Sequence, residues 1–439
     1  MTLYDHYLAA QGLVSTDSRQ PQPGTLFFAL NGPSFRGADF AAQALERGAR
    51  HAVVDDAALA ARDPARYTHA PDPLAALQAL ALAHRRRFRG PVLAITGSNG
   101  KTTTKELLTG VLAQKYRVLA TVGNLNNHIG VPLTLLRLRP QEHELAVVEM
   151  GANHQGEIGG YCQYAEPTHG LITNIGKAHL EGFGGQEGIA KGKGELFDYL
   201  AAHGGTLFVN TADARLPGIA AKAVAANQAG PAPVLSTYPG PADTYPAVLL
   251  AAGANGLRLR LWDGIETTTT LTGDYNFANL AAAAAVGAHF GVSAARVAAA
   301  LTAYEPDNNR SQRVRTARAN DLVLDAYNAN PSSMAAALRS FAAAPDGPKL
   351  VILGDMFELG DEAEAEHRAL GELLTELGLT NALLIGPLLR AAAAACPAAH
   401  HCPDKAAAAA WLRQHSPRGQ QLLLKGSRGM ALETLLEWM

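Results

Sequence analysis

The 439-residue sequence has few cysteines: only Cys162, Cys396 and Cys402 are present. Three thiols do not suggest the disulfide framework of a small secreted domain. His400 and His401 lie between the last two cysteines, a grouping that invites a zinc assignment. The spacing matches no common structural zinc site, however, and the segment is rich in alanine and proline. We expect a surface loop there.

A strong charge excess and a long apolar run are also missing. The 37 Lys and Arg residues nearly balance 39 Asp and Glu, so the formal net charge is −2, and no long basic run marks a nucleic-acid surface. The short basic cluster 84–89 is more typical of a helix end. No stretch of about 18 apolar residues is available to span a membrane, and residues 1–7 lack a secretory signal pattern. We expect a cytoplasmic protein that binds neither nucleic acid nor a membrane.

What the sequence does contain is typical of a globular protein with several cores, since 48% of its residues are hydrophobic and 17% charged. Its texture predicts three segments. Residues 1–87 form a small α/β unit. Residues 88–309 alternate apolar strands and helices, as in a mostly parallel sheet buried on both faces, and residues 310–439 repeat a doubly wound, Rossmann-like pattern. The predicted fold class is therefore α/β with three domains.

Apolar runs predict the strands of the second and third segments. They are expected at Val92–Thr96, Arg117–Ala120, Leu145–Met150, Gly170–Asn174, Thr206–Asn210, Leu322–Asp325, Leu350–Leu353, Ala382–Ile385 and Gln421–Lys425. An antiparallel insertion is expected within 232–272, where apolar and charged residues alternate.

The most informative run is the strand exit at 95–105, with a helical pattern from Thr103 to Gln114. Such a turn points several backbone N–H groups, an ammonium and a hydroxyl at one place, which suits a polyphosphate and its magnesium ion. The loop residues are Gly97, Ser98, Asn99, Gly100, Lys101, Thr102 and Thr103. Ile95 stands where the common loop has glycine, which argues against a routine motor ATPase or GTPase. The plain alternative is an ordinary strand-to-helix turn.

Three further positions suggest metal chemistry. Glu149 ends an apolar strand, where an unpaired buried charge would be costly, so we favour a magnesium ligand over a salt-bridged strand end. His179 follows the next strand, and on local grounds a ligand and a plain polar residue are equally good readings. Lys191 and Lys193 begin a glycine-containing helix, and on local grounds they are simply two solvated lysines.

The phosphate loop and five further segments together resemble the Mur ligase family of peptidoglycan synthesis, ATP-dependent enzymes that join an amine to a carboxylate. The segments are Gly123–Pro132, Glu149–His154, Asp325–Pro331, Leu353–Gly360 and Leu423–Met430. Within the family they most resemble the members that add D-alanyl-D-alanine to UDP-N-acetylmuramoyl-tripeptide through an acyl phosphate. The resemblance covers essentially the whole chain. It implies that residues 1–87 bind the UDP-sugar peptide, 88–309 bind ATP and 310–439 bind the dipeptide.

The resemblance also implies roles for single residues, with ATP and Mg²⁺ as cofactors. Lys101, His179 and Lys193 would be catalytic, and Lys193, rather than the competing Lys191, would carry a carbamate formed with carbon dioxide. The metal ligands would be Thr102, Glu149, His179 and Lys193. ATP would be held by the loop residues 97–103, by Asn276 at the adenine, Arg310 at the phosphates and Asp325 at the ribose. The UDP-sugar peptide would be bound by Ser18, Arg19, Asn126, Asn127 and the stretch Gly24–Asp39.

Two positions depart from the family pattern. Tyr275 stands where histidine is usual, and Leu324 replaces a second aspartate beside Asp325. The nearest rival function is a sibling ligase that adds the third amino acid. A folate-type polyglutamate synthetase fits the segment Asp17–Arg19 poorly, and the retained Lys101, Thr102, Glu149, His179 and Lys193 argue against a catalytically silent nucleotide-binding module. Nothing in the sequence requires more than a monomer.

Overall fold

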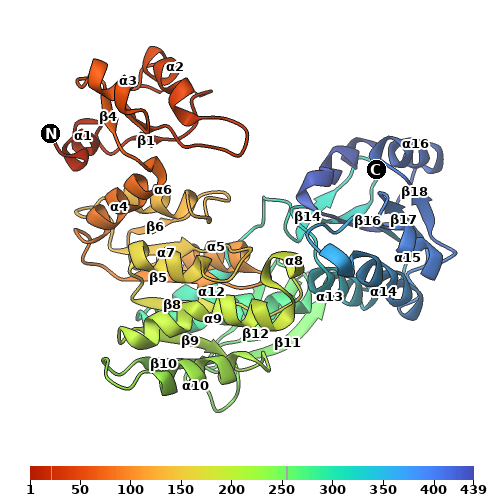
Figure 1. The fold of residues 1–439 in the computed structure, drawn as a ribbon. Helices are drawn as coiled ribbons and strands as arrows, with labels where there is room; N and C mark the ends of the chain where they lie inside the picture. The colour runs from red at the N-terminus through yellow and green to blue at the C-terminus, as the bar shows by residue number, and fades with distance from the viewer. Residues whose placement is uncertain (21, 254–255) are drawn as a thin grey trace. The chain divides into compact units, whose positions relative to one another are not determined.

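The computed structural model describes residues 1–20, 22–253 and 256–439 (Figure 1). Residues 21, 254 and 255, which fall in the expected N-terminal unit and antiparallel insertion, lie outside the described residues. The chain separates into two compact units. One comprises 1–95, 116–152 and 156–170, and the other 96–115, 153–155 and 171–439. In the described residues, no helix is both long and apolar enough to cross a membrane.

The N-terminal residues form a parallel sheet in the order β1-β2-β3-β4, as the predicted small α/β unit requires. Its strands are β1 (Val14–Ser15), β2 (Leu26–Phe28), β3 (His51–Val54) and β4 (Tyr67–His69), and its helical elements are α1 (Leu3–Ala9), η1 (Gly37–Phe40), α2 (Ala41–Glu46), α3 (Ala57–Arg62) and α4 (Pro73–Arg85). Asp72 caps α4 by accepting hydrogen bonds from the N–H groups of Leu74 and Ala75, and Pro73 occupies the first turn.

The central sheet has the order β10-β9-β8-β5-β7-β6. Its strands are β5 (Val92–Thr96), β6 (Val118–Ala120), β7 (Leu145–Glu149), β8 (His169–Ile172), β9 (Thr206–Asn210) and β10 (Val234–Tyr238). The predicted insertion is therefore partly wrong, because β10 pairs parallel with β9. Only β11 (Val248–Gly253), β12 (Gly256–Arg260) and β13 (Glu266–Thr269) form the antiparallel sheet. The exposed side chains of Val234 and Leu235, at the sheet edge, hide the pattern of a buried strand.

Helical elements alternate with these strands along the chain (Figure 1). They are α5 (Lys101–Leu112), α6 (Gly130–Leu136), α7 (Glu157–Ala165), α8 (Leu180–Phe183), α9 (Gln186–Ala202), α10 (Leu216–Ala226), η2 (Asp274–Asn276), α11 (Phe277–His289) and α12 (Ala294–Ala303). The helix after the phosphate loop begins at Lys101, two residues before the predicted start. The left-handed Gly100 (φ 78°) lets the chain turn there directly into the helix.

The C-terminal sheet has the order β14-β15-β19-β16-β17-β18, with β14 antiparallel to its neighbour and the other strands parallel. Its strands are β14 (Gln312–Arg315), β15 (Asp321–Asp325), β16 (Lys349–Gly354), β17 (Ala382–Ile385), β18 (His400–Cys402) and β19 (Gln421–Lys425). Its helical elements are α13 (Pro331–Ala342), η3 (Gly360–Glu362), α14 (Ala363–Glu376), α15 (Arg390–Ala395), α16 (Lys405–His415), η4 (Arg428–Met430) and η5 (Leu432–Trp438). Here the expected surface loop is wrong, because His400–Cys402 form an edge strand and both nearby cysteines are buried.

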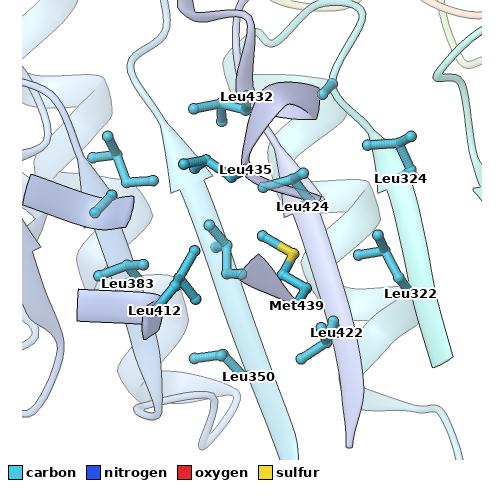
Figure 2. Packing of buried hydrophobic residues seen from close by; sticks show 14 of the residues in the cluster. Leu322, Leu324, Leu350, Leu383, Leu412, Leu422, Leu424, Leu432, Leu435 and Met439 are labelled. Atoms are coloured by element: carbon cyan, nitrogen blue, oxygen red, sulfur yellow. The ribbon is translucent and has the colours of Figure 1, made fainter. Parts of the chain in front are cut away.

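Alternating leucines hold this sheet together (Figure 2). Leu322 and Leu324 of β15 face the same core as Leu422 and Leu424 of β19, and Met439 is buried among them at the end of the chain. Burying such a side chain contributes about 1.5–3 kcal/mol. In a strand the next residue points to the other side, so Asp325 and Lys425 follow the leucines out of this core at the carboxyl end of the sheet.

Candidate active site

The phosphate loop has glycine where no side chain fits. A Cβ on Gly97, which has φ 142°, would lie 1.9 Å from Thr173 Oγ1, and a Cβ on Gly100 would lie 2.4 Å from Asn279 Oδ1. Lys101 Nζ donates to the carbonyl oxygens of Gly97 (2.7 Å) and Ser98 (3.3 Å). The ammonium therefore lies over the loop, beside the helix N-terminus that suits a phosphate.

Residues 173–176, which follow β8, hold the phosphate loop in place through hydrogen bonds. Ser98 N donates to Asn174 O (3.0 Å), and Ser98 Oγ donates to Gly176 O (2.9 Å). Asn99 N donates to Asn174 Oδ1 (3.0 Å), while Asn99 O accepts from Thr173 Oγ1 (2.6 Å). The backbone of the loop is thus fixed by the protein's own hydrogen bonds.

A buried chain of amides joins the loop helix to the predicted adenine residue. Thr104 Oγ1 donates to Asn279 Oδ1 (3.1 Å), and Asn279 Nδ2 donates to Asn276 Oδ1 (2.8 Å). Asn276 Nδ2 in turn donates to Thr272 O (2.6 Å). The sequence analysis did not single out Asn279. An asparagine that begins an alanine-rich helix is the signal that could have found it.

Glu149 lies at the end of β7, opposite Ile95 of β5, which is two residues before Gly97 of the loop. Its side chain is buried, its N–H donates to Thr121 Oγ1 (3.0 Å), and its Oε1 accepts from Asn126 Nδ2 (2.8 Å). Asn127 Oδ1 accepts from the N–H groups of the first turn of α6. The amide of Asn126 is thus directed at Glu149, and the substrate contacts of both asparagines stay predictions.

His179 and Lys193 lie on consecutive helical elements. His179, with a left-handed φ of 55°, precedes α8, and its Nδ1 is 2.5 Å from Glu358 Oε2. The hydrogen bond with His179 lowers the pKa of Glu358. Lys193 is fully buried, and its Nζ lies 5.0 Å from the centre of the Phe183 ring. Lys191 is exposed, so burial distinguishes the two candidate lysines.

The sequence predicted that Lys193 lies at the start of a helix. This prediction is wrong, because helix α9 begins at Gln186 and Lys193 lies in its second turn. The glycines of this helix allow a close approach to Phe183. A Cβ on Gly188 would lie 1.9 Å from Phe183 O, and a Cβ on Gly192 would lie 2.5 Å from Phe183 Cε1. These contacts explain why glycine occupies a helix interior that otherwise disfavours it.

The donors fit magnesium rather than a softer metal. Glu149 offers a carboxylate oxygen and Thr102 a hydroxyl, both hard ligands, whereas an ammonium on Lys193 offers none. No three His, Cys, Asp or Glu side chains gather into a metal site within the part of the chain that the structure describes. Magnesium commonly completes its shell with substrate phosphates and water. A carbamate on Lys193 would add anionic oxygen.

The predicted ribose residue, Asp325, accepts from Ser311 N (3.2 Å) through Oδ1, and its Oδ2 lies 2.5 Å from Lys425 Nζ. Tyr275 Oη is 3.0 Å from Ser311 Oγ, and burial raises the pKa of Tyr275 above its usual value, so the phenol stays protonated. Leu324 belongs to the apolar core, which accounts for the second family departure, because an aspartate there would be buried among leucines.

Arg310 and Arg19, the two arginines expected to bind substrates, contact an aromatic ring and a carboxylate respectively. The guanidinium of Arg310 lies 3.6 Å from the centre of the Tyr327 ring. Arg19 is highly exposed and makes two hydrogen bonds to Asp17, through Nε (2.8 Å) and Nη2 (3.0 Å), which lower the pKa of Asp17. Ser18, between them in sequence, is buried. Binding of phosphate or uridine by these residues stays a prediction.

Parallel α/β sheets, a phosphate loop anchored by backbone hydrogen bonds and a lysine in the loop define a nucleotide-binding α/β protein. The chain belongs to the Mur ligase family. The family model described as "Mur ligase family, catalytic domain" matches residues 12–85, the "Mur ligase middle domain" matches 95–287, and the "Mur ligase, glutamate ligase domain" matches 309–428. The architecture is therefore the three-domain α/β fold of that family, as predicted.

Individual relatives are similar to this chain over nearly its whole length. The UDP-N-acetylmuramoyl-tripeptide–D-alanyl-D-alanine ligase of Escherichia coli is 35% identical, over 96% of this chain and 92% of its own length. The enzyme of the same name from Bacillus subtilis is 32% identical, over 97% and 92%. A crystal structure of MurF from Acinetobacter baumannii superposes with a TM-score of 0.88 at 32% identity, covering 99% of this chain and 98% of its own.

We predict that Asn126→Ala weakens magnesium binding, because Glu149 loses the amide that orients its carboxylate. Loss of such an outer-shell contact typically costs about tenfold or more in metal affinity. The half-saturating Mg²⁺ concentration for ADP binding measures the effect, and Mn²⁺ binding followed by electron paramagnetic resonance gives a second readout. Asn124→Ala is the control, since its exposed side chain lies in the same loop. Equal Mg²⁺ requirements in the two variants would contradict the role.

Proposed function

We propose that this chain joins D-alanyl-D-alanine to the peptide of UDP-N-acetylmuramoyl-tripeptide in the cytoplasm, with hydrolysis of ATP to ADP and phosphate. The observation that carries the proposal is similarity over more than nine-tenths of both chains to enzymes named for this reaction. The phosphate loop with Lys101 adds independent chemical support, since the reaction needs a bound triphosphate.

The chemistry follows from the poor leaving group of a free carboxylate. The terminal carboxylate of the tripeptide attacks the γ-phosphorus of ATP, the bond to the β–γ bridging oxygen breaks, and an acyl phosphate and ADP form. The amine of D-alanyl-D-alanine then attacks the acyl carbon, loses a proton and expels phosphate. Lys101 neutralises charge as the two anions meet. Bound Mg²⁺, held by Thr102, Glu149, His179 and a carbamate on Lys193, would add charge neutralisation at the phosphates.

The three domains divide the substrates in this proposal. Residues 1–87 bind the UDP-sugar through Ser18 and Arg19, 88–309 bind ATP, and 310–439 bring the dipeptide. Three substrates on three domains favour a mechanism in which domain movement completes the site once all are bound. The proposed reaction requires no second copy of the chain, so we propose that it acts as a monomer.

Choice of the amine separates this function from that of a sibling ligase. With ATP and UDP-N-acetylmuramoyl-tripeptide, we expect ADP release and one new product only when D-alanyl-D-alanine is added. Mass spectrometry of the product identifies the bond formed. Turnover with lysine or diaminopimelate on the UDP-dipeptide would support the sibling ligase, and no ADP with any amine would support a silent nucleotide-binding module.

Lys101→Ala should reduce kcat by about 10²-fold or more, because the variant loses the cation that the loop holds beside the phosphates. Steady-state kinetics of ADP release measure the effect, and circular dichroism shows that the variant is folded. Lys115→Ala is the matched control, because Lys115 lies beyond the other end of α5 and donates to Phe290 O and Gly291 O. Unchanged kcat in Lys101→Ala would remove the loop from the chemistry.

Lys193→Ala should abolish turnover, and short carboxylic acids such as acetate should restore part of it if the lysine acts as a carbamate. A ¹³C nuclear magnetic resonance signal from protein incubated with labelled bicarbonate gives direct evidence, and this signal should persist in Lys191→Ala. A wild-type protein without the labelled signal, together with failure of acetate to rescue, would refute the carbamate while leaving the ligase reaction intact.

A further inference from the structure

A lysine that the proposed reaction does not use is buried at the end of β19. Lys425 is 2% exposed and lies between β15 and β16, opposite Asp325 on one side and Leu353 on the other. Its Nζ is 2.5 Å from Asp325 Oδ2 and 3.2 Å from Asn328 O. The ammonium is therefore held at the carboxyl edge of the C-terminal sheet.

Stability alone is a weak explanation for this pair. Taking an ammonium and a carboxylate out of water costs several kcal/mol per ion, and well-packed apolar residues in place of a buried ion pair are often as stable or more stable. Leu423, two residues before Lys425 and therefore on the same face of β19, is buried, so the fold already accepts an apolar side chain beside this site. The ion pair between Lys425 and Asp325 is more simply explained if its role is to orient the Asp325 carboxylate.

The second oxygen of Asp325 is fixed from the opposite direction. Asp325 Oδ1 accepts from Ser311 N (3.2 Å), and Ser311 holds a left-handed backbone with φ 49°. Asn309, two residues earlier, is also left-handed, with φ 58°. Such conformations are unfavourable for most non-glycine residues and persist where the surroundings fix them. The backbone at Ser311 is therefore held in an unfavourable conformation that brings this N–H group to Asp325.

The side chain of Ser311 connects Asp325 with the residues predicted near the adenine. Its Oγ lies 3.0 Å from Tyr275 Oη and 3.4 Å from Asn276 Nδ2. Asn276 is joined through Asn279 to the helix of the phosphate loop. One line of hydrogen bonds thus runs from Thr104, in the helix that follows the phosphate loop, through the residues predicted at the adenine and the ribose, and it ends at Lys425.

We propose that Lys425 and Tyr275 are positioning residues that aim the Asp325 carboxylate at the ribose hydroxyls of ATP, Lys425 directly and Tyr275 through Ser311. The proposal deepens the proposed function and rests on it. Each carboxylate oxygen has two acceptor sites, so Asp325 can hold its protein partners and still accept from a ribose hydroxyl. The charge of Lys425 also offsets the repulsion between Asp325 and a bound triphosphate.

The test compares ATP with 2′-deoxy-ATP and 3′-deoxy-ATP. Wild-type protein should prefer ATP to at least one deoxy analogue, in KM and in direct binding of the matching diphosphates by calorimetry. Lys425→Met keeps side-chain length and removes the charge, so the preference should fall about tenfold, with the KM of D-alanyl-D-alanine unchanged. Lys425→Arg should restore part of it. Tyr275→Phe removes one hydroxyl and should lower the preference severalfold in the same direction.

Lys349→Met is the matched control, because Lys349 begins the neighbouring strand β16 and its Nζ donates only to the carbonyl oxygens of Ala342 and Ala344 among the described residues. A merely structural ion pair would lower the unfolding temperature of Lys425→Met and leave the ribose preference at its wild-type value, which would overturn the proposal. If Lys425→Met does not fold, Tyr275→Phe decides by the same ratio.

The two failures are distinguishable. Wild-type protein that ligates the substrates while its Lys425→Met and Tyr275→Phe variants keep the ribose preference refutes the positioning role only. Wild-type protein that binds ADP but forms no product refutes the proposed function, and the calorimetric comparison of ADP with its deoxy analogues still reports on Lys425.

Discussion

The site depends on one steric constraint, the lack of a side chain at Gly97 and Gly100. Thr173 and Asn279 occupy the space that a Cβ would need, and both also bond to the loop or its helix. Any larger residue at either glycine would push the loop away from its own anchors. The constraint therefore links two requirements that look separate in sequence: a backbone shape that binds phosphate, and a rigid connection from that backbone to β8 and α11.

Rigidity on this scale has a mechanistic consequence. Because the amides of Asn276 and Asn279 are committed to protein partners, the residue predicted at the adenine cannot shift without disturbing the helix that follows the phosphate loop. Preorganised donors of this kind stabilise developing charge without the cost of reorienting when the reaction occurs. Buried polar networks stabilise only when every member is satisfied, so the network tolerates few substitutions.

The sequence predicted those elements of the fold that a short stretch of residues marks by its own pattern. The buried strands β5, β9, β17 and β19 have their predicted bounds, since continuous apolar runs mark them. It missed β10 and β18 because edge strands carry exposed or polar residues. For the site, the strand end nominated Glu149, whereas Asp325 was nominated only by the family resemblance. Sequence reasoning could not foresee the partners Asn126 and Lys425, because the pairs lie 23 and 100 residues apart in sequence. The loop after β6 brings Asn126 to Glu149, and the register of β15 and β19 brings Lys425 to Asp325.

The two buried lysines show why burial must be interpreted together with its surroundings. Both Lys193 and Lys425 are removed from water, a cost that an ammonium bears only with compensation. Lys425 has a carboxylate 2.5 Å away, which keeps the charged form useful as a fixed partner. Lys193 faces the ring of Phe183 in a helix that glycines bring close. Chemistry that converts the amine into a carbamate would make that burial productive, whereas the same chemistry at Lys425 would set two anions against each other.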